Sequence, residues 1–152
     1  MPKTSAGILA YRKKNELEVF LVHPGGPFYT KKDEGAWTIP KGEFVDGEDA
    51  LDAAKREFQE ETGIAPTGEM NALTPFKQKG GKMIFAWALD IDFDASAIRS
   101  NMFEMEWPPR SGKMKQFPEV DRGEWFALEL AFTKILPSQA VLLEEIRKLY
   151  GA

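Results

Sequence analysis

The sequence contains no cysteine and only one histidine, His23. The absence of cysteine excludes disulfide bonds, thiolate catalysis and cysteine-ligated zinc, and it fits a reducing compartment. A catalytic triad or a histidine-rich metal site would depend on that single imidazole. Carboxylates are therefore the groups left for acid–base chemistry and for metal binding.

Long apolar runs and an excess of positive charge are also missing. No apolar run approaches the roughly 20 residues that a membrane span needs, and the N-terminal segment lacks the apolar core of a signal peptide. The formal net charge of −4 disfavours nucleic-acid binding, which normally requires a basic excess. We therefore expect a cytoplasmic protein without membrane contact, folded as one domain over residues 1–152.

Runs of β-favouring residues, separated by glycine and proline, predict a chain made mostly of strands. The predicted strands cover residues 5–11, 18–22, 37–39, 73–78, 83–91, 103–107 and 124–127. Apolar residues at helical spacing and end signals predict two helices, at residues 47–63 and 138–150. Residues 28–36 read as an exposed loop. This order predicts an α+β sandwich around a mixed sheet.

The first predicted helix carries three glutamates, Glu57, Glu60 and Glu61, on one face. At about 100° per residue, their side chains fall within an arc of about 100°. Two carboxylates about 6 Å apart repel by about 3 kcal/mol at an effective dielectric of roughly 20, and a shared divalent cation would turn this repulsion into attraction. The cluster therefore indicates a metal site.

An acidic run can also mark a solvated helix face, because glutamate is a good helix former. The rest of the face distinguishes the two interpretations. Three alanines project from the same side as Glu57 and Glu61, namely Ala50, Ala53 and Ala54. Small side chains allow the helix to approach the body of the protein closely, so the acidic turns are expected to continue a buried side. Hard oxygen ligands in such a place suit Mg²⁺ or Mn²⁺.

The segment from residue 42 to residue 64 resembles the signature of the Nudix hydrolases. That signature is a glycine, five residues, a glutamate, seven residues, and then Arg-Glu-apolar-any-Glu-Glu-any-Gly-apolar. The matching positions here are Gly42, Glu48, Arg56, Glu57, Phe58, Glu60, Glu61, Gly63 and Ile64. The order of the preceding strands, and the later Glu119-Val120 and Trp125-Phe126 pairs, also look like the family. The resemblance implies a Nudix-type α/β/α sandwich.

Nudix hydrolases cleave a diphosphate linkage in a nucleoside diphosphate joined to another group, using Mg²⁺ or Mn²⁺. The resemblance implies that Glu57, Glu60 and Glu61 ligate the metal and that water attacks phosphorus. The general base comes either from the signature or from a later loop, where Glu119 is the candidate. For Glu119 the alternative is an ordinary exposed loop acid. Arg56 can reach Glu60 one helical turn on, and would hold that carboxylate in place.

The remaining signature residues are expected to be structural. Glu48 lies near the helix start, on the side opposite Glu57, where it would stabilise the helix dipole or pair with Arg56. Gly42 and Gly63 are expected to supply backbone freedom at the two ends of the signature.

Two segments are candidates for binding the substrate. Residues 37–42 resemble the corresponding stretch of diadenosine polyphosphate hydrolases, which implies that Lys41 contacts phosphate; a solvated lysine is the alternative. Those enzymes commonly have histidine where this chain has Glu43, and a base-stacking tyrosine that this chain lacks. The segment of residues 106–113 contains Arg110 and Lys113 together with an aromatic residue and two prolines, so this loop could bind phosphate. A proline-stiffened connection is its alternative interpretation.

The sequence thus predicts a metal-dependent pyrophosphohydrolase whose small-molecule substrate is a nucleoside polyphosphate, with a dinucleoside polyphosphate as one candidate. ADP-ribose or a nucleotide sugar is the alternative substrate. A nucleotide-binding module without catalysis is less consistent with the complete set of signature glutamates. Removal of messenger-RNA caps is disfavoured by the acidic charge balance. The sequence favours no particular oligomeric state.

Overall fold

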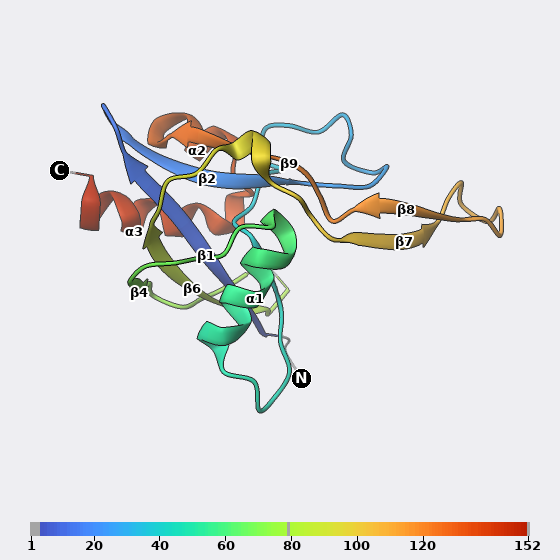
Figure 1. The fold of residues 1–152 in the computed structure, drawn as a ribbon, viewed down its shortest axis with the longest axis horizontal. Helices are drawn as coiled ribbons and strands as arrows, with labels where there is room; N and C mark the ends of the chain where they lie inside the picture. Colours follow the sequence, from blue (N-terminus) through green and yellow to red (C-terminus); the bar gives the residue numbers. More distant parts are fainter. Residues whose placement is uncertain (1–3, 79, 152) are drawn as a thin grey trace.

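The computed structural model describes residues 4–78 and 80–151, and a mixed sheet forms the centre of this part of the chain (Figure 1). The strands of the sheet are β1 Thr4–Lys13, β2 Leu17–Pro24, β3 Lys41–Glu43, β4 Met70–Ala72, β5 Phe76–Lys77, β6 Met83–Asp90 and β9 Val120–Ala127. Their order is β4-β6-β1-β2-β9, with β3 paired to β1 and β5 paired to β6. Strands β1 and β6 are parallel and the other pairs are antiparallel. The predicted mixed sheet is confirmed.

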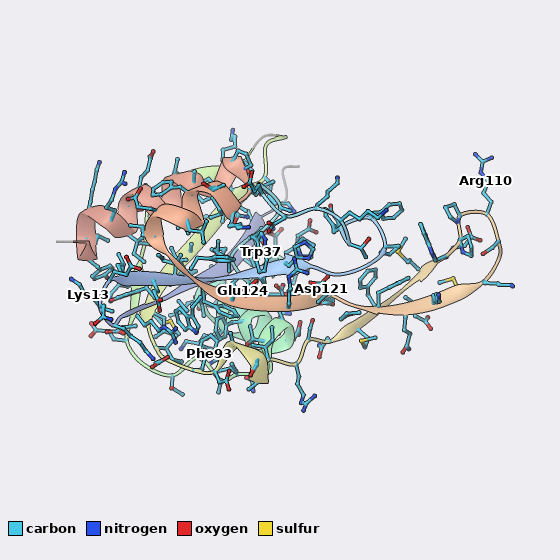
Figure 2. The ribbon with its side chains drawn as sticks, turned by 90° about the horizontal axis from the view of Figure 1, so that it is seen from above. Lys13, Trp37, Phe93, Arg110, Asp121 and Glu124 are labelled. Atoms are coloured by element: carbon cyan, nitrogen blue, oxygen red, sulfur yellow. The ribbon has the colours of Figure 1, made fainter. Side chains whose placement is uncertain are left out.

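Helices cover both faces of the sheet. Helix α1, Ala50–Thr62, packs on one face, whereas α2, Leu128–Lys134, and α3, Ala140–Tyr150, pack on the other (Figure 2). Alternate residues of β1 supply the two layers. Ile8 lies in the cluster with α1, and Leu9 lies in the cluster with α2 and α3. The predicted α/β/α sandwich is therefore confirmed. None of the helices within the described residues is long and apolar enough to cross a membrane.

Helix α1 is fixed by a cap at each end. Its N-cap is Asp49, whose side chain accepts a hydrogen bond from the backbone N–H of Asp52 at 3.1 Å. At the other end Gly63 adopts a left-handed φ of 74° and donates its N–H to the carbonyl of Gln59. The predicted start at residue 47 is too early, because residues 45–48 form a turn before the helix.

Strands β7, Met102–Glu106, and β8, Met114–Pro118, form a separate two-stranded hairpin, here called the β7–β8 arm. The arm extends away from the sandwich (Figure 1). The Glu106 carboxylate fixes its turn by accepting backbone hydrogen bonds from Arg110 and Gly112, both at 3.0 Å. The sequence predicted β7 but not β8, because residues 114–116 are all exposed and show no apolar alternation.

Other expectations about the elements were partly wrong. Residues 37–39 make only isolated bridges, and the strand begins after Pro40. The strand expected at residues 73–78 reduces to β5, because Thr74 and Pro75 separate β5 from β4. Strand β5 pairs antiparallel with β6. Strand β9 begins at Val120, earlier than expected. Helix α2 is too short to show a helical period, and a 3₁₀ turn, Pro137–Gln139, precedes α3. The predicted loop at residues 28–36 is confirmed.

Candidate active site

The Glu57 carboxylate lies directly against strand β3. A Cβ atom added to Gly42 would overlap that carboxylate. Gly42 does not have a left-handed φ, whereas Gly63 does. The expectation of backbone freedom is therefore correct for Gly63 and wrong for Gly42. Gly42 matters because it lacks a side chain, which lets α1 bring its acidic face up to the edge of the sheet.

Arg56 ties three carboxylates together. Its Nε and Nη2 atoms donate to Glu48 at 3.1 and 3.3 Å, and its Nη1 atom lies 2.9 Å from Glu57 and 3.3 Å from Glu60. These contacts raise the pKa of Arg56, the hydrogen bond to Glu48 most of all. The predicted contact with Glu60 is present, and of the two roles considered for Glu48 the structure shows pairing with Arg56. Arg56 thus fixes the positions of the acidic side chains around it.

Glu61 is the most strongly perturbed acid of the site. Burial raises its pKa to about 9, and repulsion from Glu57 and Glu119 adds to the shift. Its carboxylate accepts a hydrogen bond from the backbone N–H of Lys41, and this contact acts in the opposite direction. Glu61 therefore connects the end of α1 to strand β3 and holds a proton readily in the absence of other cations.

Glu57 is also largely withdrawn from solvent, with a side chain 12% exposed. Burial raises its pKa, and repulsion from Glu60 acts in the same direction, opposed by Arg56. Ala53 and Ala54 on the same helix are fully buried. The prediction that the acidic turns continue a buried side of the helix is confirmed.

Glu119, between β8 and β9, lies beside α1 although the two are far apart in the sequence. Its backbone N–H donates to the carbonyl of Asn101 at 2.8 Å, and the N–H of Asn101 donates to the carbonyl of Glu60 at 2.8 Å. Its carbonyl accepts from the N–H of Gly25 at 2.9 Å. Glu119 is itself an exposed residue, but partial desolvation raises its pKa, and repulsion from Glu57 and Glu60 raises it further. The structure thus places this acid within the electrostatic field of the α1 glutamates.

Lys41 and Lys82 bring positive charge to the same region. Burial lowers the pKa of Lys41, and the charge of Lys82 lowers it further, while Glu61, Glu43 and Glu57 act in the opposite direction. The Nζ atom of Lys82 lies 3.0 Å from the carboxylate of Glu43. The structure therefore brings Lys41 to the acidic cluster. Lys82 was missed by sequence reasoning, because it reaches the site from the start of β6.

Arg110 and Lys113 are not brought to this site. Both belong to the turn of the β7–β8 arm, and Figure 2 shows Arg110 at the tip of the arm, away from α1. Arg110 adopts a positive φ of 60° in that turn. The expected loop is the turn between β7 and β8, at the far end of the arm, which explains why its cations lie away from α1.

His23 is fully buried and has a structural role. Its Nε2 atom lies 2.6 Å from the carbonyl oxygen of Lys32, and its Nδ1 atom lies 2.9 Å from Asp121. These contacts join the end of β2, the loop of residues 25–36 and the start of β9. The loop of residues 25–36 is therefore held close to Glu119 by the buried side chain of His23, a contact that sequence spacing does not reveal.

The donor chemistry of the site fits a divalent cation. Among the described residues no three histidine or carboxylate side chains are grouped closely enough to hold a metal ion, and Arg56 bonds to Glu57 and Glu60 instead. However, Glu57, Glu61 and Glu119 all have pKa values raised by desolvation and by repulsion from neighbouring glutamates. Hard oxygen donors that carry such poorly compensated charge suit Mg²⁺ or Mn²⁺.

Similarity to known proteins is consistent with this geometry. Nudix hydrolase 7 of Arabidopsis thaliana is 30% identical over 112 residues, which are 68% of this chain and 38% of that protein. The chain thus spans less than two fifths of the length of this relative. A C. elegans Ap4A hydrolase in a binary complex is 24% identical, with a TM-score of 0.65 and coverage of 97% and 96%. The NUDIX domain of Shewanella oneidensis NrtR, complexed with ADP ribose, is 16% identical, with a TM-score of 0.68 and coverage of 98% and 88%.

The two solved structures share the fold of this chain, with the helices arranged on both faces of a mixed sheet. The family model that describes the NUDIX domain matches residues 1–146. This match includes α1 with its acidic face, strand β3 and the segment that carries Glu119. The chain therefore belongs to the NUDIX family.

Proposed function

We propose that this protein is a pyrophosphohydrolase that depends on a divalent metal and cleaves a diphosphate linkage in a nucleoside polyphosphate. One observation carries the proposal. The carboxylates of α1 and Glu119 repel one another, and they lie beside two lysines, Lys41 and Lys82, that also repel each other. Paired cations next to clustered acids match the needs of a metal–phosphate substrate, whose phosphates attract lysine and whose metal attracts carboxylate.

The acidic face of α1 would hold the metal. Glu57, Glu60 and Glu61 are the proposed ligands, and Mg²⁺ or Mn²⁺ is the proposed ion. When bound, the cation would neutralise phosphate oxygens and increase the acidity of nearby water. Arg56 would keep Glu60 in position, since it already contacts both Glu48 and Glu60.

Glu119 is the proposed general base that takes a proton from the attacking water. A base works best when its pKa approaches the working pH, and the pKa of Glu119 is raised by partial desolvation and by the α1 glutamates. Its backbone is held by Asn101 and Gly25, which would keep the carboxylate beside α1. A base from within the signature, such as Glu61, is the alternative.

The phosphate chain would lie against Lys41 and Lys82. Burial and the nearby charge of Lys82 lower the pKa of Lys41, so an anion between the two ammonium groups would be bound favourably. Binding of the substrate by Arg110 and Lys113 stays a prediction, and it would require the arm to approach α1.

A panel of substrates tests the proposal. Wild-type protein is incubated with nucleoside triphosphates, dinucleoside polyphosphates, ADP-ribose and nucleotide sugars, with Mg²⁺, Mn²⁺ or a chelator, in water labelled with heavy oxygen. We expect cleavage of a phosphate–phosphate bond only with metal, and label in one phosphate product. Tight binding of one nucleotide without turnover would instead support a module without catalysis.

Hydrolysis of ADP-ribose or a nucleotide sugar is the second candidate function. It is favoured by the likeness to the NrtR domain, whose structure holds ADP ribose. The two candidates give different products. ADP-ribose or a nucleotide sugar yields a mononucleotide and a sugar phosphate, whereas a dinucleoside polyphosphate yields two nucleotides, so product chromatography separates them.

A further inference from the structure

A hollow of about 530 Å³ lies on the face of the sheet opposite α1. It is lined by Gln78, Lys82, Leu136, Pro137 and Ser138, and is here called the Ser138 hollow. Its volume falls within the range of about 300–1,000 Å³ that is typical of small-molecule sites. Two segments distant in sequence form it, the turn that leads into β6 and the 3₁₀ turn before α3.

Lys82 connects this hollow to the acidic site. It lines the hollow, and its Nζ atom lies 3.0 Å from Glu43 on β3. The next residues of β3 are Gly42, which contacts Glu57, and Lys41, whose N–H is bonded to Glu61. A molecule that reaches from the hollow along β3 would therefore meet the Lys82–Glu43 ion pair first, then Lys41 and then the carboxylates of α1. Two lysines thus lie between the hollow and the α1 carboxylates, as a nucleoside followed by its phosphates would require.

The lining of the hollow combines an apolar floor with neutral polar atoms. Leu136 and Pro137 supply the floor. Gln78 Nε2 donates to Ser138 Oγ at 2.8 Å, and within the described residues the amide oxygen of Gln78 and the hydroxyl hydrogen of Ser138 have no protein partner. One acceptor and one donor beside an apolar surface suit the edge of a nucleobase or a sugar hydroxyl better than a further phosphate.

The frame of the hollow is held firmly. The N–H of Leu136 donates to the carbonyl of Trp37 at 2.7 Å. The buried side chain of Gln139 accepts a hydrogen bond from the N–H of Ile39 at 3.1 Å. These bonds attach the 3₁₀ turn to the segment that leads directly into β3. The hollow and the phosphate-facing strand therefore have fixed relative positions.

We propose that the Ser138 hollow binds the nucleoside of the substrate, with Gln78 and Ser138 as the residues that recognise it. This inference rests on the proposed function, and it adds the class of substrate group that sits outside the diphosphate. It places specificity in residues outside the signature, on the α3 side of the sheet.

Two substitutions at Ser138 test the proposal. Ser138→Phe would fill the hollow, and we expect it to raise the KM for the best nucleoside polyphosphate at least about tenfold. The Ki of inorganic tripolyphosphate, a competitor without a nucleoside, should not change. Ser138→Ala removes only the hydroxyl and should raise KM by a factor of about 2 to 10, which corresponds to one hydrogen bond. If Ser138→Phe does not fold, the milder variant Ser138→Ala still tests whether the hollow binds the nucleoside.

Val141→Phe is the matched control. Val141 is 47% exposed at the start of α3, close to Ser138 in sequence, but it lines a different hollow of about 520 Å³, together with Thr74 and Glu145. Its KM and Ki should equal those of wild type. Calorimetric titration with nucleoside triphosphates gives the same comparison without turnover.

The possible results separate the two proposals. Unchanged KM and nucleotide affinity in folded Ser138 variants would overturn the nucleoside site alone. A parallel rise in KM and in the Ki of tripolyphosphate would also overturn it, because the nucleoside would then not be the group affected. Absence of turnover by wild type across the whole panel would overturn the proposed function, and the calorimetric comparison would still decide the nucleoside site.

Discussion

At the scale of single residues, the site depends on two glutamate side chains of α1 that lie directly against strand β3. The Glu57 carboxylate occupies the space that a side chain at position 42 would fill, and the Glu61 carboxylate accepts the backbone N–H of Lys41. Burial raises the pKa of both acids, whereas the hydrogen bond from the Lys41 N–H lowers the pKa of Glu61. The ionised form of these acids is therefore disfavoured, and a bound cation would relieve this cost.

Gly42→Ala should disrupt the site even though the change adds only one carbon. The new Cβ would overlap the Glu57 carboxylate, so either that side chain or the strand must move. We expect a loss of at least about 10-fold in kcat/KM, since even groups that only orient a metal ligand affect activity by 10- to 100-fold. Gly47→Ala is the control for backbone strain, because an added Cβ there meets nothing within 4 Å although the φ of 92° strains an alanine. Equal activity of Gly42→Ala and wild type would contradict the assigned contact.

Glu61 should make the metal-free protein less stable as pH rises. The native protein holds the Glu61 proton up to a pH of about 9, whereas the unfolded chain releases it near the ordinary value of 4.5. Unfolding thus releases a proton in this window, and the free energy of unfolding falls with pH by up to about 1.4 kcal/mol per pH unit. Glu61→Gln should flatten this slope in urea titrations with a chelator present.

An exposed acid provides the control for that measurement. Glu104→Gln, on the β7–β8 arm, should keep the wild-type slope. A stability that rises with pH for wild type, or an identical slope in Glu61→Gln, would show that Glu61 does not hold its proton in the native state.

Some of these residues could be predicted from the sequence and others could not. Helical spacing alone placed Glu57, Glu60 and Glu61 on one face, because neighbours within a helix follow its period. Asn101 and Lys82 were missed, since they reach the site from the segments just before β7 and β6 and no local period relates them to α1. The steric role of Gly42 was also hidden, because it depends on how closely α1 approaches β3.

At the scale of elements, α1 was predicted well and the β7–β8 arm poorly. Helix α1 has local end signals in Asp49 and Gly63, and both act as caps in the structure. The second strand of the arm is exposed over residues 114–116, so it lacks the alternation that reveals a strand. Short or fully exposed elements are fixed by pairing with distant segments, which a single sequence does not show.

The position of the arm gives a direct test of the cations in its turn. In the structure Arg110 lies at the arm tip, away from α1 (Figure 2). With the arm in this position, the double variant Arg110→Ala/Lys113→Ala should change KM by no more than about 2-fold, as surface substitutions usually have small effects. Steady-state kinetics on the best substrate measures this. If the double variant instead raised KM about tenfold or more, the arm would approach the substrate, as the sequence suggested. Lys41→Ala, by comparison, should raise KM strongly.

At the scale of the whole molecule, the sheet separates two layers and the site lies where strand β3 connects them. The carboxylates belong to the α1 side, through Gly42 and Glu57. The Ser138 hollow belongs to the side of α2 and α3. Lys41 and Lys82 lie between the two. The two proposals therefore assign chemistry and specificity to opposite faces of one sheet, with the specificity outside the signature.

The most direct test of the central claim is the rate of diphosphate cleavage by Glu60→Gln under Mg²⁺, followed by phosphorus NMR. The substitution keeps the size of the side chain and removes the charge of a proposed metal ligand. We expect the rate to fall at least about 100-fold, more than the loss expected for a residue that only orients a ligand, with the melting temperature near that of wild type. A Glu60→Gln protein that cleaves the best substrate as fast as wild type would contradict the assignment of α1 as the metal-binding face.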